Sequence, residues 1–366
     1  MESIKYYLER IEATNKAVMG QAQERLDSLV KPPKSLGKLE DIAQKLAGIT
    51  GQVYGNALDK RCVVIMSADN GVVEEGVSSA PMAVTHMQSI NFTKGITGVT
   101  VLADLFHSDV KVVDIGINAD VNDEKIINKK IRKGTANITK GPALSLEETQ
   151  KAILVGIELA LSLSEAGYHV IGVGEMGIGN TTTSSALLSV LLGLEPEQVT
   201  GKGAGLSEDA YANKLAVIKK AILVNQATQE DDILTLLSKL GGLDIAGMVG
   251  LYIGCSYKRV PVVIDGFISA VAALLAYRLN PLCADYMFAS HHSMEIGYKY
   301  AISEIGLEAP LNLDMRLGEG SGCPMMFMLM EASLATMTKM GTFAQGNIDE
   351  KYKEDVKNAN FHIGGL

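Results

Sequence analysis

The sequence has no tryptophan, only four cysteines in 366 residues, and no block of basic residues. The cysteines are scattered and form no Cys-x-x-Cys pair, which argues against structural zinc and is typical of a reduced, cytoplasmic protein. The formal net charge of −9 makes nucleic acids and anionic membranes unfavourable partners. We therefore expect any bound phosphate to be held by local donors rather than by a general positive field.

Long hydrophobic runs and several catalytic signatures are also missing. The most apolar run, Ile268–Tyr277, is too short to cross a bilayer, and Met1–Lys5 shows no signal-peptide pattern. The chain contains no Gly-x-Ser-x-Gly, no Walker A motif and no His-Glu-x-x-His, which disfavours a hydrolase elbow, a P-loop and a zincin. The pair His291-His292 could bind a metal, but a structural or phosphate-contacting role is favoured. We expect no metal and no cofactor.

Most of the chain alternates between short β-branched runs and long helical patterns, and 47% of its residues are hydrophobic. Continuous apolar strands that alternate with helices predict a parallel sheet with helices on both faces, in the α/β class. Pro261 is expected at the start of its strand. The predicted strands are Cys62–Met66, Val110–Ile115, Tyr168–Val173 and Val260–Ile264, and the predicted helices are Met82–Leu105, Leu146–Ala166, Thr182–Leu192, Ser207–Gln226 and Leu243–Tyr257.

The two ends of the chain are predicted to be helical and to lack strands. Lys31-Pro32-Pro33 interrupts the first helices, and Ser35 is expected to cap a third helix that Gly51 closes. We predict a small helical domain of residues 1–58 with about 323–366, and a larger domain of residues 59–322. The helices expected in the small domain are Ile4–Met19, Gln21–Val30, Ser35–Ile49, Cys323–Met340 and Glu350–Asn358.

One carboxylate stands between two glycines in the run Leu317-Gly-Glu-Gly-Ser-Gly322. Glycine on both sides lets a ligand approach the backbone, and Glu319 could take a proton from a ligand bound there. The alternative is that Glu319 only caps the helix predicted from Cys323. A helix dipole would lower the pKa of Glu319, so a general base at this position requires an apolar lining.

A second glycine-rich turn, Gly172–Thr183, follows a predicted strand. It matches the dinucleotide fingerprint Gly-x-Gly-x-x-Gly, but that fingerprint requires an acid at a strand end about 20 residues on, where Glu195 lies in a helix end. An NAD-dependent oxidoreductase is therefore a minor alternative. Backbone N–H groups and threonine hydroxyls at a helix start favour a mononucleotide phosphate site, although a cap with close packing would look the same. Glu175 could accept hydrogen bonds from a ribose.

Other candidate ligand groups follow the predicted strands or precede a helix. Asp69-Asn70-Gly71 and Asp265-Gly266 stand at strand ends, where open α/β sheets bind their ligands. Lys214, after the flexible run Gly201–Gly205, could complete a phosphate site or could lie on a solvated helix face.

Several further motifs are spread in order along nearly the whole chain. They are Lys31-Pro-Pro-Lys-Ser-Leu-Gly37, Glu75-Gly-Val77 with Pro81 and Val84-Thr85, Gly172-Val-Gly-Glu-Met-Gly177 with Asn180-Thr-Thr182, Ala212-Asn-Lys214, Asp265-Gly-Phe267 and Met315-Arg-Leu-Gly-Glu-Gly-Ser-Gly322. Together they resemble the nicotinate-nucleotide:dimethylbenzimidazole phosphoribosyltransferase family. This resemblance implies a Rossmann-like fold, a homodimer, and transfer of phosphoribose from nicotinate mononucleotide to an aromatic base, giving an α-riboside 5′-phosphate in cobamide assembly.

The resemblance also assigns roles to individual residues. The general base falls on Glu319, and the ligand groups divide into two sets. The nucleotide set is Glu175, Gly177, Asn180, Thr181, Thr182, Gly203, Lys214, Asp265 and Ser290, and the aromatic-base set is Ala80, Met87, Gln88 and Leu317.

Two positions depart from the family pattern. Asn70 stands where a histidine is usual, and Ala80 where a serine is often found near the aromatic base. Without that hydroxyl the acceptor loses a polar contact, so the acceptor could be another benzimidazole, a purine or a phenol. A subunit of a heterodimeric phenol or p-cresol transferase, and a non-catalytic nucleotide-binding subunit, are the remaining alternatives.

Overall fold

The computed structural model describes residues 2–202, 205 and 207–349. The chain divides into two compact units. The sheet unit contains the residues up to Glu12 and Asp59–Met326, and the helical unit contains Ala13–Leu58 and the described residues from Phe327 onward. These boundaries differ from the predicted ones at the N-terminus, since helix α1 (Ile4–Leu8) groups with the sheet. The ring of Tyr7 packs edge-on against Tyr257 at 5.2 Å, and Asn280 donates to the carbonyl of Leu8.

The sheet unit contains six parallel strands in the order β3-β2-β1-β4-β5-β6, which confirms the predicted parallel α/β sheet and its Rossmann-like arrangement. The direction of the strand order reverses between β1 and β4. Open sheets of this kind bind ligands beyond the carboxyl ends of the strands at such a reversal. The strands are β1 (Arg61–Ala68), β2 (Asp109–Gly116), β3 (Ile126–Asn128), β4 (Val170–Met176), β5 (Val262–Ile264) and β6 (Met287–Ala289).

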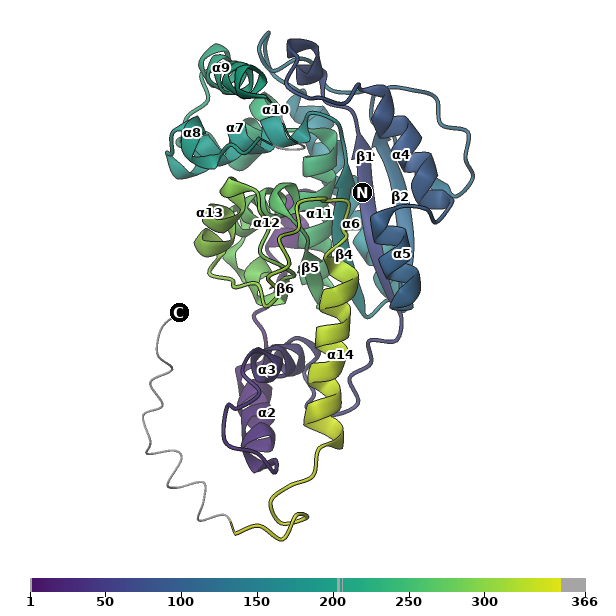
Figure 1. Ribbon diagram of the computed structural model, residues 1–366, viewed down its shortest axis with the longest axis vertical. Coiled ribbons are helices and arrows are strands. Elements are labelled where there is room, and N and C mark those ends of the chain that lie inside the picture. The colour runs from purple at the N-terminus through teal and green to yellow at the C-terminus, as the bar shows by residue number, and fades with distance from the viewer. Residues whose placement is uncertain (1, 203–204, 206, 350–366) are drawn as a thin grey trace. The chain divides into compact units, whose positions relative to one another are not determined.

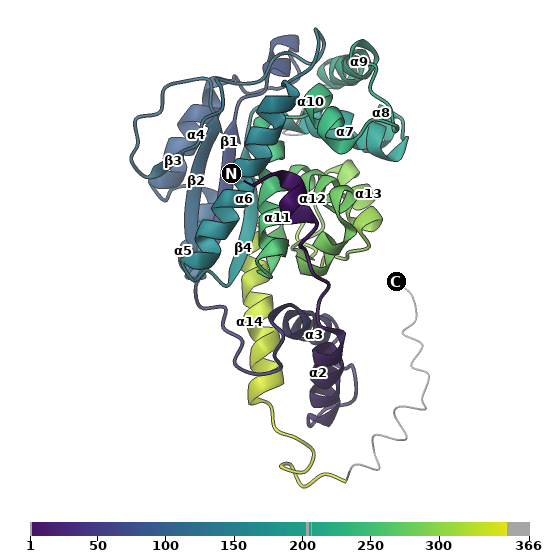
Figure 2. The same cartoon turned by 180° about the vertical axis from the view of Figure 1, so that it is seen from behind.

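Helices cover both faces of this sheet. Figure 1 shows α4 and α5 on the near side of β1 and β2, and Figure 2, the view from behind, shows α6 in front of the opposite face. The remaining helices of the sheet unit, α7 to α13, are formed by residues 180–305. The bounds are α4 (Ala83–Thr93), α5 (Gly98–Leu105), α6 (Leu146–Glu165), α7 (Asn180–Leu192), α8 (Pro196–Val199), α9 (Glu208–Val224), α10 (Ile233–Leu240), α11 (Leu243–Tyr257), α12 (Phe267–Leu279) and α13 (Ile296–Ile305), with 3-10 turns η1 (Gly71–Glu75) and η2 (Pro281–Tyr286).

The single helix predicted over Met82–Leu105 is wrong, because two helices occupy this stretch. Gly95 adopts a left-handed φ of +73°, and Thr97 opens α5 with a capping box that includes Thr100. Left-handed glycine ends a helix, and a capped threonine starts one. The first of the two helices, α4, contacts the carboxyl end of β1. Its Ser89 donates to Thr85 O and contacts Ser67 of β1.

The core of the sheet unit is formed by α11, which is buried along Leu243–Ser256. It lies against α6 with almost no space between the two backbones. A Cβ at Gly250 would come within 1.8 Å of the carbonyl oxygen of Ile153. Glycine is therefore required here for close helix packing.

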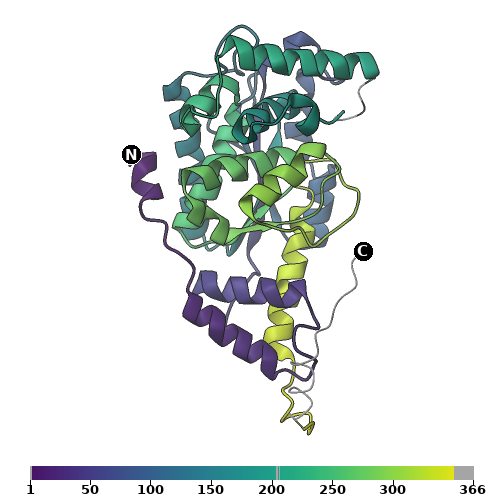
Figure 3. The same cartoon turned by 90° about the vertical axis from the view of Figure 1, so that its left-hand side faces the viewer.

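The helical unit contains segments from both halves of the chain. Helices α2 (Lys16–Ser28) and α3 (Lys38–Thr50) lie side by side in Figure 3, and α14 (Cys323–Lys339) enters the unit from Phe327. Within the unit, Arg25 donates to the carbonyls of Met337 and Met340 at 3.0 and 2.8 Å.

Two predicted features of the first helices are wrong. Asn15 caps α2 by accepting from Val18 N, so the continuous helix Ile4–Met19 does not form. Ser35 does not cap α3, which begins after Gly37, and Glu40 accepts from Leu36 N instead. The predicted helix Glu350–Asn358 lies outside the described residues.

Candidate active site

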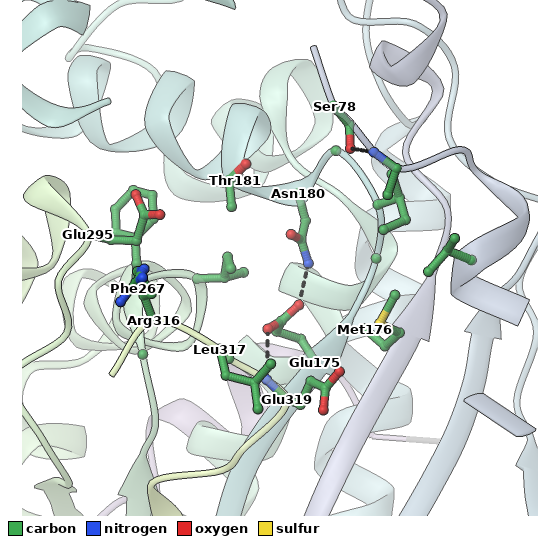
Figure 4. Close-up of a pocket in the computed structure, with 18 of the residues that line it drawn as sticks. Ser78, Glu175, Met176, Asn180, Thr181, Phe267, Glu295, Arg316, Leu317 and Glu319 are labelled. Atoms are coloured by element: carbon green, nitrogen blue, oxygen red, sulfur yellow. Dashed lines mark hydrogen bonds between the residues drawn. The ribbon is translucent and has the colours of Figure 1, made fainter. Parts of the chain in front are cut away.

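A cavity of about 400 Å³ opens at the carboxyl ends of the strands, within the sheet unit. Figure 4 shows the side chains that line it, with Glu175 and Glu319 near one another and Asn180 above them. The lining comes from the segment before α4, the turn from β4 to α7, the start of α12 and the run that ends at Glu319. Each of these four segments contains residues that the sequence analysis identifies as candidates for ligand binding.

Glu319 lines this cavity and is 8% exposed. Gln88 Nε2 donates to its Oε1 at 2.7 Å, while its buried Oε2 has no hydrogen-bond partner within the described chain. Burial raises the pKa of Glu319, and the hydrogen bond from Gln88 lowers it in part. A carboxylate with raised proton affinity and a free oxygen in a cavity can accept a proton from a bound ligand.

The Glu319 loop, Gly318–Gly322, has an unusual backbone. Gly318, Glu319 and Gly320 have left-handed φ values of +79°, +62° and +83°. Asp265 accepts from the N–H groups of Gly320 and Gly322, and Glu175 accepts from the N–H of Glu319. The loop also touches the sheet, since a Cβ at Gly174 would lie 2.7 Å from Glu319 O. Gly174, the second glycine of the Gly-x-Gly-x-x-Gly pattern, therefore leaves the space that this loop occupies.

Several residues predicted for the nucleotide come together at the start of α7. Glu175, Gly177, Asn180, Thr181 and Lys214 all line the cavity. Lys214 Nζ donates to Thr181 Oγ1 at 3.0 Å and to Gly201 O at 3.4 Å, and its residue is only 1% exposed. Burial lowers the pKa of Lys214 to about 8, against the opposing charge of Glu295. This is a buried cation beside a helix start, which suits an anionic ligand.

Other members of the predicted nucleotide set do not reach the cavity. Thr182 and Ser290 are fully buried and absent from its lining. Ser290 Oγ bonds to Asp265 O and His291 Nδ1. Asp265 is 1% exposed and holds the Glu319 loop. Gly203 lies outside the described residues.

The predicted aromatic-base set is divided. Ala80, Gln88 and Leu317 line the cavity. Met87 is absent from the lining and its residue is 51% exposed, because consecutive residues of a helix such as α4 point in different directions. Leu317 and Val84 supply apolar surface beside Glu319.

Three buried carboxyl groups belong to the site: Glu175 lines the cavity, Asp265 accepts from the Glu319 loop, and Asp244 accepts from Asn180. Burial raises the pKa of Glu175 to about 8, of Asp265 to about 7 and of Asp244 to about 6. Asn180 Nδ2 donates to both Glu175 and Asp244, which lowers both values in part. Glu175 is therefore mostly protonated at pH 7.

The sequence analysis gives no role to six polar residues of the lining. They are Ser78, Ser79, Lys202, Ser293, Glu295 and Arg316. The pKa of Glu295 is raised by burial, while Lys214 and Arg316 lower it. Arg316 precedes Leu317 and could have been found from that position, whereas Ser293 and Glu295 carry no local signal.

The described residues hold neither a metal cluster nor a membrane span. They contain no group of three or more His, Cys, Asp or Glu side chains arranged to hold a metal ion. No helix in the described ranges combines the length and the apolar character needed to cross a membrane. His291 is buried and its Nδ1 bonds to Ser290.

Known proteins match this chain over nearly its whole length. A protein named nicotinate-nucleotide–dimethylbenzimidazole phosphoribosyltransferase from Clostridium perfringens is 51% identical over 356 residues, 97% of this chain and 98% of that protein. One of the same name from Clostridium acetobutylicum is 48% identical over 96% of this chain and 99% of that protein. The crystal structure of CobT from Thermus thermophilus matches with a TM-score of 0.87 at 36% identity, covering 91% of this chain and 99% of that chain.

The family model described as Phosphoribosyltransferase matches residues 11–348. This match spans both units, including the described ends of the helical one. With the relatives above it leads to one conclusion: the chain belongs to this family of phosphoribosyltransferases.

Proposed function

We propose that this enzyme transfers phosphoribose from nicotinate mononucleotide to 5,6-dimethylbenzimidazole or a similar aromatic base, in the assembly of the cobamide nucleotide loop. The names of relatives that match almost end to end support the choice of substrates. The observation that carries the proposal is Glu319, buried in the cavity with a raised pKa and one unpartnered oxygen among the described residues.

The proposed reaction exchanges one bond at C1′ of the ribose for another. The acceptor nitrogen attacks C1′, the bond from C1′ to the pyridine nitrogen breaks, and its electron pair neutralises the pyridinium, so nicotinate leaves. Glu319 takes the proton that the acceptor loses. Attack opposite the leaving group inverts C1′ and gives the α product. The leaving group is already cationic, so the reaction is expected to need no metal or cofactor.

Two groups of lining residues suit the two substrates. Thr181, Lys214 and the start of α7 offer donors for the 5′-phosphate. Ala80, Gln88 and Leu317 line the same cavity as Glu319, to which Gln88 donates, and they suit a flat aromatic base. The enzyme's main task is to place the acceptor nitrogen near C1′ and in line with the leaving group.

Location and assembly are further parts of the proposal. Four buried free cysteines favour the reducing cytoplasm. A homodimer is supported by the apolar side chains of Val101 and Leu105, exposed one turn apart on α5. Light scattering of the purified chain would separate a homodimer from a monomer that needs a related subunit.

A nicotinate-release assay across benzimidazole, purine and phenol acceptors tests the proposed function. Glu319→Gln should fold normally and lose roughly 10²–10⁴ in rate, because the amide cannot take the proton. Glu230→Gln, an exposed glutamate in the same unit, is the matched control and should keep wild-type activity. Near-normal turnover by Glu319→Gln at neutral pH, or no nicotinate release by the wild type with any acceptor, would refute the proposal.

A further inference from the structure

The backbone of the Glu319 loop requires support. A residue with a side chain costs about 1–2 kcal/mol in the left-handed conformation, and Glu319 adopts it between two glycines that do the same. Such a conformation persists only where its surroundings determine it. The loop must therefore be held by groups that select this conformation.

Asp265 provides the largest part of that support. Its Oδ2 accepts from Gly320 N at 2.9 Å and its Oδ1 from Gly322 N at 2.7 Å, so both carboxylate oxygens are engaged by the loop. Hydrogen bonds from N–H groups to a buried carboxylate are among the stronger ones in proteins. Both bonds are directed at the backbone on the carboxyl side of Glu319.

Asp265 is itself held firmly at the end of β5. Its N–H donates to Ser269 Oγ at 3.1 Å, and its carbonyl accepts from Ser290 Oγ at 3.3 Å. Its residue is 1% exposed and does not line the cavity. The carboxylate therefore faces the loop and is not placed to touch a bound nucleotide.

Glu175 supports the loop from the other side. Its Oε1 accepts from Glu319 N at 3.3 Å, and its Oε2 accepts from Asn180 at the start of α7. Ser321 N bonds within the loop to Gly318 O. Two buried carboxyl groups on adjacent strands thus receive the N–H groups of Glu319, Gly320 and Gly322.

We propose that Asp265 is a positioning residue for Glu319. Its bonds to Gly320 and Gly322 fix the left-handed turn that directs the Glu319 carboxylate into the cavity. This role replaces the nucleotide contact implied by the resemblance. It rests on the proposed function, because positioning affects the rate only if Glu319 takes the proton.

A double-mutant cycle tests whether Asp265 acts through Glu319. Asp265→Asn places an NH₂ group against one of the two loop N–H groups, which displaces Glu319. Since a misplacement of 1 Å can cost about 10²-fold, kcat should fall by about that factor while KM for nicotinate mononucleotide stays within about twofold. In the Glu319→Gln background the same change should cost less than about threefold. An equal loss in both backgrounds, or a loss confined to KM, would overturn the proposal.

Gly322→Ala provides a second variant that leaves the carboxylate in place. A Cβ at Gly322 would lie 2.3 Å from His291 Nδ1 and 2.6 Å from Ser290 Oγ, so we expect the loop to shift while the carboxylate of Asp265 is retained. The same loss of kcat, again absent in the Glu319→Gln background, is expected. This variant decides the question if Asp265→Asn fails to fold.

Amide hydrogen exchange gives a readout that does not depend on activity. Residues 316–323 should exchange faster in Asp265→Asn than in the wild type. Asp244→Asn is the matched control, since Asp244 is also buried but accepts from Asn180 rather than from the loop. Its exchange over 316–323 should match the wild type. Unchanged exchange in Asp265→Asn beside an active wild type would overturn the role of Asp265 alone, whereas an inactive wild type would overturn the proposed function alone.

Discussion

At the scale of single residues, the proton affinity of Glu319 results from two opposing effects. Burial raises its pKa, and the hydrogen bond from Gln88 lowers it. Neither effect can be predicted from the run Gly-Glu-Gly, which indicates a reactive carboxylate but says nothing of the residue that donates to it. Gln88 lies 231 residues away, so only the fold brings the two together.

Gln88→Met tests this balance. Removing the donor to Oε1 should raise the pKa of Glu319, so the acidic limb of kcat/KM should move to higher pH. Nicotinate release measured against pH would show the shift. Asn91→Ala is the control: Asn91 donates to Gln88 rather than to Glu319, so the limb should stay close to that of the wild type. An unmoved limb in Gln88→Met would contradict the assigned role of the hydrogen bond.

At the scale of elements, the sequence predicted the long central ones best. The predicted helix Leu243–Tyr257 has the bounds of α11, and the predicted strands overlap β1, β2 and β4, because buried residues leave a clear apolar pattern. The strands Ile126–Asn128 and Met287–Ala289 escaped prediction, since three residues at the sheet edge are too short for any periodicity. The role of Asp265 also escaped prediction, because it depends on a loop 55 residues away.

Gly174→Ala tests the contact between β4 and the Glu319 loop. The new Cβ would press on Glu319 O, a backbone atom that cannot move alone, so the loop should shift. We expect a loss of about 1–3 kcal/mol in the free energy of unfolding and a lower kcat. Urea unfolding and nicotinate release measure the two effects. Gly20→Ala on α2, with nothing within 4 Å, should instead be neutral or stabilising. Wild-type activity in Gly174→Ala would exclude the contact.

At the scale of the whole molecule, the sequence correctly predicted a Rossmann-like parallel sheet. It placed α1 with the wrong unit, because five residues of helix carry no sign of the aromatic contact with Tyr257. The site depends on buried acids contributed by separate strands, and their proton binding is coupled to the folding of the entire sheet.

Glu175 should make the free energy of unfolding depend on pH. Its pKa is about 8 in the folded chain against an ordinary 4.5, so between these values the folded state holds a proton that the unfolded state has released. The stability it contributes is fully present below about pH 4.5 and is lost as pH rises through about 8. His291 and Lys214 act in the opposite direction, because burial lowers their pKa values. The contribution of Glu175 is therefore obtained by measuring the free energy of unfolding against pH for the wild type and for a variant without this carboxyl group, and subtracting one from the other.

Glu175→Gln should not lose this stability between pH 5 and 7.5. Its free energy of unfolding should therefore diverge from that of the wild type by up to about 1.4 kcal/mol per pH unit. Urea unfolding at several pH values measures both profiles. Glu230→Gln, which is exposed, should keep the wild-type slope. Parallel profiles for Glu175→Gln and the wild type would show that Glu175 is ionised in the folded chain.

The left-handed backbone of Glu319 has a consequence for how sequences of this fold can vary. Asparagine and glycine tolerate that conformation better than glutamate does. If variants are selected for thermal resistance alone, glutamate at position 319 should therefore be replaced by residues that tolerate the left-handed conformation. On the proposed mechanism, selection for turnover maintains glutamate at position 319, although its left-handed backbone costs stability.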